Sequence, residues 1–209
     1  MTISIRRRKG KVIFTLCLLW VIALVAVYDV PLSQALKAND GLGEIVARYG
    51  YWMGHGSVMI SLLVLILILG FVFPQTRFKS AGARALLAFI LSGVLAQIIK
   101  HLVGRPRPRL LTEGIHHFGP TLASGLDSFP SGHAASAVAV ATALSFYYPR
   151  ATPLFMFIAS FIAASRIFSG SHFPIDILGG TILGLSVGLI ISSYGRRSRA
   201  ISFYGESDQ

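Results

Sequence analysis

Cysteine and acidic residues are scarce in this chain of 209 residues. Cys17 is the only cysteine, so a disulfide framework and a cysteine-based zinc site are both excluded within one chain. Eight aspartate and glutamate residues stand against nineteen lysine and arginine residues, which gives a net charge of +11. An excess of basic groups suits either nucleic acid or the anionic headgroups of lipids.

Charge of either sign is rare, and apolar runs take its place. Only 13% of the residues are charged and 54% are hydrophobic, and the mean hydropathy of +0.68 excludes an ordinary soluble domain. A buried core helix would explain one apolar run but not six in succession. We therefore predict an all-α integral membrane protein, a single domain over residues 1–209, with no nucleic-acid partner. Its six transmembrane helices are expected at about 12–28, 57–73, 85–102, 132–148, 151–165 and 175–194.

The basic residues predict how these helices are oriented. The stretch RRRKGK precedes the first apolar run, and no small-residue cleavage site follows that run, so we expect an uncleaved span rather than a signal peptide. With the N-terminus inside, twelve of the nineteen Lys and Arg residues fall in cytoplasmic segments and seven in outer segments. The positive-inside rule then favours cytoplasmic N- and C-termini in the inner (plasma) membrane. The long outer segments are expected at about 29–56, where an interfacial helix fits, and at about 103–131.

The first stretch that carries chemistry is KHLVGRPRPRL, which contains Lys100 at the end of the third predicted span. Arg105, Arg107 and Arg109 alternate with prolines, and a residue before proline adopts an extended conformation. Side chains two residues apart in an extended chain point the same way, so we expect a row of guanidinium groups. Arginine binds phosphate oxygens in a bidentate way. A basic patch on anionic lipid would fit this stretch equally well.

The second stretch is DSFPSGHAAS, where Ser131, Gly132 and His133 are expected to open the fourth span. The N-terminus of a helix presents free backbone N–H groups to an anion, and Gly132 lets a ligand approach the backbone closely. A plain helix cap with an interfacial histidine is the alternative for this stretch alone.

The third stretch, SRIFSGSHFPID, places Arg166, His172 and Asp176 within eleven residues at the mouths of two apolar segments. Pro174 fits the first turn of a helix, which puts Asp176 in that turn. The carboxylate either stabilises the helix dipole or accepts a hydrogen bond from His172, leaving the other imidazole nitrogen free as a nucleophile. All three stretches fall on the outer side of the predicted topology, and together their groups suit in-line phosphoryl transfer.

The three stretches resemble the tripartite signature of the type-2 phosphatidic acid phosphatase superfamily. The resemblance rests on Lys100-x6-Arg107-Pro108, on Pro130-Ser131-Gly132-His133, and on Ser165-Arg166-x5-His172-x3-Asp176. It implies a metal-independent, cofactor-free phosphatase whose active site is extracytoplasmic, that is, periplasmic or extracellular. The implied catalytic residues are His172 as nucleophile, Asp176 as its orienting group and His133 as general acid. The implied phosphate-binding residues are Lys100, Arg107, Ser131, Gly132 and Arg166.

Two further arginines and the exact function stay open at this point. Arg105 and Arg109 are candidates for a second phosphate or for the membrane surface. The leading function is hydrolysis of a lipid phosphate, with undecaprenyl diphosphate, phosphatidylglycerophosphate, phosphatidate and lipid A phosphate as candidate substrates. A lipid phosphotransferase with the same phosphohistidine is one alternative, and an anion or phospholipid transporter is another. A transporter is disfavoured because carriers place their site near the midplane.

The sequence does not fix the oligomeric state. Adjacent His116 and His117 are expected to be solvent-exposed rather than to bind a metal.

Overall fold

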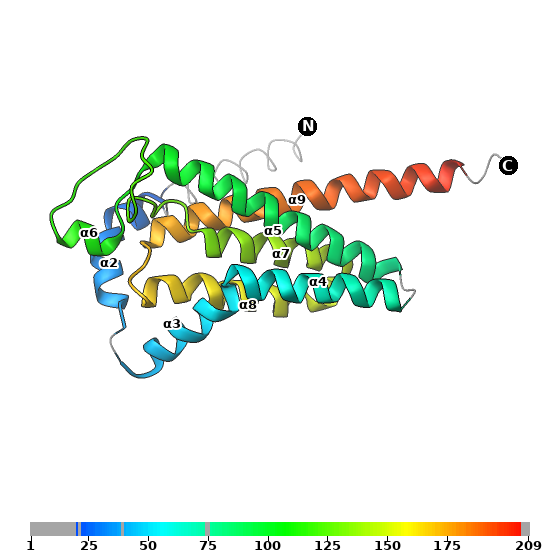
Figure 1. Cartoon of the computed structure of the whole chain (residues 1–209), viewed down its shortest axis with the longest axis horizontal. Coiled ribbons are helices and arrows are strands. Elements are labelled where there is room, and N and C mark those ends of the chain that lie inside the picture. The colour runs from blue at the N-terminus through cyan, green and yellow to red at the C-terminus, as the bar shows by residue number, and fades with distance from the viewer. Residues whose placement is uncertain (1–19, 21, 39, 74–75, 206–209) are drawn as a thin grey trace, which may run out of the picture.

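The computed structural model describes residues 20, 22–38, 40–73 and 76–205, and within them it is helical with no strand. Two helices, α2 (Asp29–Leu36) and α3 (Gly41–Gly54), occupy the segment where an interfacial helix was expected. The long helices that follow are α4 (Gly56–Val72), α5 (Thr76–Val103), α7 (Gly132–Tyr147), α8 (Thr152–Phe168) and α9 (Pro174–Gly205). Short pieces, α6 (Pro108–Thr112) and the 3₁₀ turn η1 (Pro149–Ala151), lie between them. The long helices lie side by side in one bundle (Figure 1).

Some helices of the bundle are long enough to span a membrane. In the described ranges, three helical stretches are long and apolar enough to cross a membrane: Arg77–Thr112, Pro149–Phe168 and Pro174–Tyr194. The pair α3 and α4, bent by 52°, would make a fourth if it forms one span. The helix at 132–147 has 16 residues and falls short by itself. The first predicted span, about 12–28, lies mostly outside the described residues, so the six-span layout stays a prediction.

Helix α7 is the centre of the bundle, packed against α5, α8 and α9. Its residues 134–143 are all buried, and they are small: alanine, valine, serine and threonine. Small side chains let helix backbones approach closely, which is how helices associate in lipid. Helix α9 faces them with a glycine at every fourth position. A side-chain carbon at Gly180 would lie 2.5 Å from the Ser131 carbonyl oxygen, and one at Gly184 would collide with the Ala135 carbonyl oxygen.

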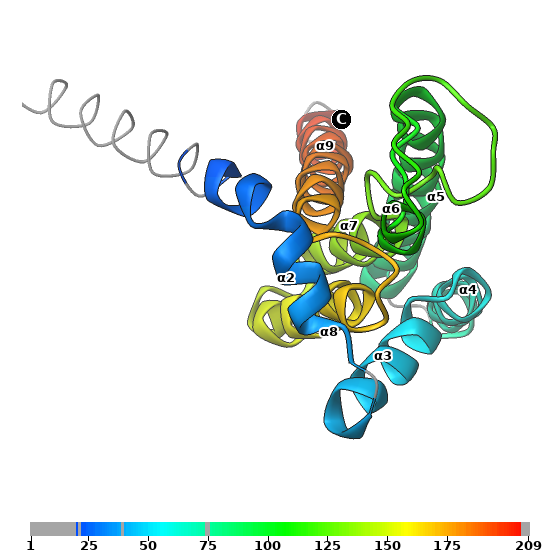
Figure 2. The same ribbon diagram turned by 90° about the vertical axis from the view of Figure 1, so that its left-hand side faces the viewer.

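This close packing fixes the start of α7 against the start of α9. The Ser131 backbone N–H donates to the Asp176 carbonyl oxygen at 2.9 Å. The two helices begin at the same end of the bundle, where α5 and α8 end (Figure 1). Helix α2 lies across that end and contacts α8 and α9 (Figure 2). The three chemistry-bearing stretches, which span residues 100–176, are therefore brought to one end of the molecule.

Candidate active site

The two helix starts predicted from proline and glycine are confirmed. Helix α7 begins at Gly132 after Ser131 as its N-cap, and α9 begins at Pro174 with Asp176 in its first turn. Lys100 lies in the last turn of α5 and Arg166 in the last turn of α8. His172 lies in the short connection between α8 and α9, where its backbone N–H donates to the Arg166 carbonyl oxygen at 3.2 Å. Four different helix ends therefore supply the candidate site.

Lys100 and Arg107 meet at one carboxylate, that of Asp127. Arg107 donates two hydrogen bonds to it, from Nε at 2.9 Å and from Nη2 at 2.7 Å. The Lys100 ammonium is buried, 3.7 Å from the Asp127 carboxylate, and donates to the Asp127 carbonyl oxygen at 2.5 Å. Burial alone would raise the pKa of the Asp127 carboxyl, but the hydrogen bond from Arg107 and the two positive charges outweigh it and lower the pKa to about 2. The two cations are thus held together by a permanently ionised partner.

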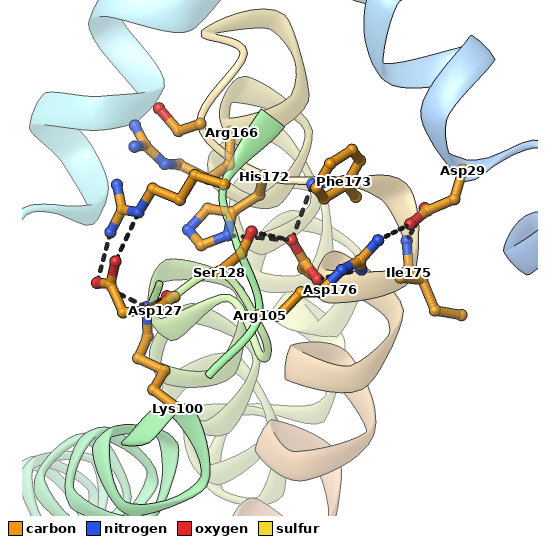
Figure 3. A network of polar contacts seen from close by, with 12 residues as sticks. Asp29, Lys100, Arg105, Asp127, Ser128, Arg166, His172, Phe173, Ile175 and Asp176 are labelled. Atoms are coloured by element: carbon orange, nitrogen blue, oxygen red, sulfur yellow. Dashed lines mark hydrogen bonds and ion pairs between the residues drawn. The ribbon is translucent and has the colours of Figure 1, made fainter. Parts of the chain in front are cut away.

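The His172 imidazole lies between this group and Asp176 (Figure 3). Its Nδ1 is 3.5 Å from Asp176 Oδ2, which is longer than an ordinary hydrogen bond. Oδ2 already accepts hydrogen bonds from the Ser128 hydroxyl at 2.5 Å and the Phe173 N–H at 2.9 Å. Catalytic hydrogen bonds are often this long without substrate and shorten when it binds. Burial lowers the pKa of the His172 imidazole, so this ring stays neutral near neutral pH.

The expected row of three guanidinium groups is not formed. The extended chain ends at Arg107, because Pro108 starts the short helix α6 and carries Arg109 onto its exposed surface. Arg105 turns to the far side of Asp176 from His172 (Figure 3). There it pairs with Asp176 Oδ1 at 2.6 Å and Asp29 Oδ2 at 2.5 Å. Of the three arginines, only Arg107 joins Lys100.

His133, in the first turn of α7, packs against α3 beside Arg166. The Tyr51 ring stacks on the His133 ring, with centroids 5.7 Å apart, and the Arg166 guanidinium lies 5.2 Å from the centre of the same tyrosine ring. Gly54 permits this contact, since a side-chain carbon there would lie 2.7 Å from His133 Cδ2. Tyr51 is thus part of the site's wall.

Buried polar atoms without a hydrogen-bond partner gather at this place. In the described part of the chain they include Ser131 Oγ, His133 Nε2, Arg166 Nε and His172 Nδ1. Unsatisfied buried polar groups are rare in folded proteins and each requires an explanation. All four residues belong to the sets that the sequence proposed as catalytic or phosphate-binding. A bound polar ligand would satisfy the atoms of Ser131, His133 and Arg166, whereas His172 Nδ1 faces Asp176 Oδ2 at 3.5 Å.

A cavity of about 190 Å³ opens beside Lys100 and His133. Its polar end is formed by these two residues together with Gly132, where an added side-chain carbon would lie 3.9 Å from Lys100 Cε. From there it continues between α4, α5 and α7 along Phe89, Gly93 and Ala96. The cavity touches His133 and not His172, so a ligand chain in it would approach from the His133 side.

Three residues that hydrogen-bond within the site, Asp29, Asp127 and Ser128, are not among the candidates that the sequence indicates. Each acts through a partner distant in the chain, so no local spacing indicates it. Asp127 and Ser128 lie just before the Pro-Ser-Gly-His stretch, separated from it by Phe129, and this position was the one available signal.

No group of three or more histidine, cysteine, aspartate or glutamate residues suited to a metal occurs among the described residues. His116 is exposed, and His117 Nε2 lies 3.3 Å from the Gly119 carbonyl oxygen. Metal independence therefore stays a prediction that activity measurements must test.

Comparison with known proteins agrees with the signature. A decaprenylphosphoryl-5-phosphoribose phosphatase of Mycobacterium tuberculosis is 36% identical, over 79% of this chain and 88% of its own length. A lipid A 1-phosphatase of Rhizobium johnstonii is 28% identical, over 78% of this chain and 72% of its own. The crystal structure of Aquifex aeolicus LpxE superposes with a TM-score of 0.61 at 28% identity, covering 79% of this chain and 95% of that one. The model of the PAP2 superfamily matches residues 81–200, which include all three stretches, so this multi-pass membrane protein belongs to the PAP2 superfamily of phosphatases.

Proposed function

We propose that the protein is a lipid phosphatase that removes phosphate from a membrane lipid at the extracytoplasmic surface. The observation that carries the proposal is the group of unpartnered buried polar atoms on Ser131, His133 and Arg166, next to the paired cations Lys100 and Arg107 and the His172 ring. A phosphate dianion provides the acceptors that such donors need, and arginine and lysine are the side chains best suited to it.

The reaction runs in two steps. The His172 Nε2 lone pair attacks phosphorus while the bond from phosphorus to the lipid oxygen breaks, and His133 gives its proton to that oxygen. Water then attacks the phosphohistidine, His133 takes a proton from this water, and inorganic phosphate leaves with His172 restored. Lys100, Arg107 and Arg166 stabilise the equatorial oxygens in both steps, together with the Ser131 hydroxyl and the Gly132 N–H.

The lipid nature of the substrate is supported by the cavity between α4, α5 and α7. Its apolar walls lead from the bundle to His133, the group that would protonate the leaving lipid oxygen. The relatives named above act on lipid A and on a decaprenyl-linked phosphosugar, as their names state. We therefore propose polyprenyl-linked phosphates, including undecaprenyl diphosphate, and lipid A phosphate as the first substrates to test, followed by phosphatidylglycerophosphate and phosphatidate.

Activity is expected to survive removal of divalent metal ions. The purified protein in detergent is offered a panel of these lipid phosphates with EDTA present, and release of inorganic phosphate is measured. Vanadate should inhibit, because it adopts the trigonal-bipyramidal geometry of the transferring phosphoryl group. Loss of activity in EDTA with recovery on adding zinc or magnesium would overturn the metal-free mechanism. Transfer of phosphate to a second lipid without release of inorganic phosphate would identify a phosphotransferase instead.

The active site is expected to face outward, with both termini in the cytoplasm. The reason is the distribution of Lys and Arg over the predicted loops, of which the cytoplasmic set holds twelve of nineteen. Alkaline phosphatase, which is active only outside the cytoplasm, is fused after Gln209 in one strain and within the segment 113–118 in another. Activity in the second fusion alone is the expected pattern, and the reverse pattern would show that the topology is inverted.

A further inference from the structure

Arg105 occupies a place that the phosphatase mechanism above does not use. Its guanidinium lies between two buried carboxylates, and the side chains of Arg105, Asp29 and Asp176 are only 14%, 5% and 0% exposed. Side chains buried this deeply contribute nothing to a general basic surface for lipid. We propose that Asp29 and Arg105 are positioning residues, which hold the Asp176 carboxylate in the orientation that His172 needs. This inference rests on the proposed function, because it presumes that His172 is the nucleophile.

Three donors hold the Asp176 carboxylate, and His172 approaches one of its two oxygens. Arg105 Nη1 donates to Oδ1, while the Ser128 hydroxyl and the Phe173 N–H donate to Oδ2. These contacts come from the loop after α5, from the loop before α7 and from the connection before α9. His172 Nδ1 approaches the same Oδ2, at 3.5 Å. A carboxylate fixed on three sides selects one ring orientation and one tautomer of the imidazole.

Asp29 completes the arrangement from the N-terminal part of the chain. Its Oδ2 accepts from Arg105 Nη2 at 2.5 Å, and its Oδ1 accepts the Ile175 N–H at 2.7 Å. The second bond ties Asp29 to the first turn of α9, directly beside Asp176. The guanidinium also lies over the Phe173 ring, 4.1 Å from its centre. Arg105 is thus fixed by two ion pairs and one ring, all next to the His172 connection.

The charges explain why one arginine needs two carboxylates. If Asp176 were the only carboxylate, the Arg105 guanidinium would neutralise the negative charge of Asp176. The carboxylate would then be a weaker acceptor for a hydrogen bond from His172. Asp29 takes half of the guanidinium fork, so Arg105 orients Asp176 while a net negative charge remains in the group. Breaking one member of a buried ion pair leaves an uncompensated charge, so each member is expected to matter for geometry as well.

The test compares three variants: Arg105→Gln, which removes the charge, Arg105→Lys, which keeps the charge but lacks the two-armed fork, and Asp29→Asn, which removes the charge and keeps the shape. We expect kcat on the best lipid phosphate to fall by about 10–100-fold in Arg105→Gln, the range found when an outer partner of a metal-site ligand is removed. Smaller losses are expected in Arg105→Lys and Asp29→Asn. KM should stay close to the wild-type value, because none of the three changes touches the phosphate-binding cations.

The pH dependence of kcat/KM separates positioning from general damage. Its acid limb reports the protonation of His172 in the free enzyme. Losing the Arg105 charge stabilises the imidazolium, so the acid limb should move to higher pH in Arg105→Gln and stay in place in Arg105→Lys. Losing the negative charge of Asp29 destabilises the imidazolium, so Asp29→Asn should move the acid limb to lower pH. The substrate's own ionisation is the same for every variant and cancels in the comparison. The other titratable groups near His172 are unchanged throughout: Lys100, Arg107, Asp127, His133, Arg166 and Asp176.

A matched control is available on α3. Arg48 and Glu44 form an ion pair of similar length, 2.6 Å, but their side chains are 65% and 51% exposed. Arg48→Gln and Glu44→Gln should keep wild-type kcat and the wild-type pH profile. If Arg105→Gln does not fold, Asp29→Asn alone decides the question, through the direction in which the acid limb of its pH profile moves.

Three results would contradict the inference. They are wild-type kcat in Arg105→Gln, a loss confined to KM, and equal losses in Arg105→Gln and Arg105→Lys with an unmoved acid limb. The first would mean that Arg105 has no part in catalysis, the second that it acts in substrate binding, and the third that its role is merely structural. Failure of the proposed function looks different, since the wild-type protein would then release no phosphate or His172→Ala would remain active.

Discussion

Replacing His172 with alanine is expected to abolish phosphatase activity on every substrate, whatever group leaves. The ring lies next to the Lys100 and Arg107 pair on one side and Asp176 on the other, and its pKa is lowered by burial, so a neutral nitrogen faces the site. Loss of a nucleophile removes the bond-forming step itself, and losses beyond about 10⁴-fold are typical when such a residue is deleted. Initial rates on one lipid phosphate and one aryl phosphate, with the variant shown to be monodisperse in detergent, provide the measurement.

Two companion variants sharpen the result. Asp176→Asn should lose less than His172→Ala, because the nucleophile remains while its orienting charge is gone. His116→Ala, a change at an exposed histidine, should behave as wild type. When the wild-type protein is mixed with ³²P-labelled substrate, an acid-labile ³²P label should form rapidly on the chain. The label should be absent from His172→Ala. Aryl phosphatase activity that persists in His172→Ala would assign the nucleophile elsewhere.

The helices and the ends of the helices near the site could be predicted because their signals are local. Apolar runs, the Pro130-Ser131-Gly132 cap and the position of Pro174 each act within one or two turns, and α7 and α9 begin where these residues indicate. The predicted segments at 57–73, 132–148 and 175–194 correspond to α4, α7 and the first part of α9. Helix α5 begins well before the predicted residue 85, since its first turns, which include Arg77 and Lys79, carry charges that hide a helix from a hydropathy criterion.

The partners of the proposed catalytic groups could not be predicted, because they depend on contacts between distant parts of the chain. Asp29 meets Arg105 and Ile175, which are 76 and 146 residues away. Alternation along RPRPR predicted a common direction for three arginines, but each finds a different environment: Arg105 two carboxylates, Arg107 Asp127, and Arg109 the surface of α6. Alternation fixes the side on which a residue leaves the backbone, whereas a long flexible side chain follows the nearest opposite charge.

The two histidines of the site should be distinguishable by the leaving group of the substrate. His133 lies at the cavity between α4, α5 and α7, on the side from which a lipid would depart, and its Nε2 has no hydrogen-bond partner in the described part of the chain. General acid catalysis is typically worth about 10²–10⁴-fold when the leaving oxygen is strongly basic. A lipid alkoxide is such a group, whereas p-nitrophenolate leaves with little help from an acid. His133→Ala should therefore lose about 10²–10⁴-fold on a lipid phosphate and much less on p-nitrophenyl phosphate.

The comparison must be made on kcat/KM, because this constant includes the steps only up to formation of the phosphohistidine. Hydrolysis of that intermediate also uses His133 as a base in the proposed mechanism, and its slowing would lower kcat on both substrates alike. An acid-labile ³²P label should consequently accumulate in His133→Ala with the aryl substrate. Arg48→Gln, a change at an exposed residue of α3, serves as the control, with kcat/KM close to wild type on both substrates. An equal fall of kcat/KM on both substrates in His133→Ala would mean that this residue binds phosphate rather than protonating the leaving oxygen.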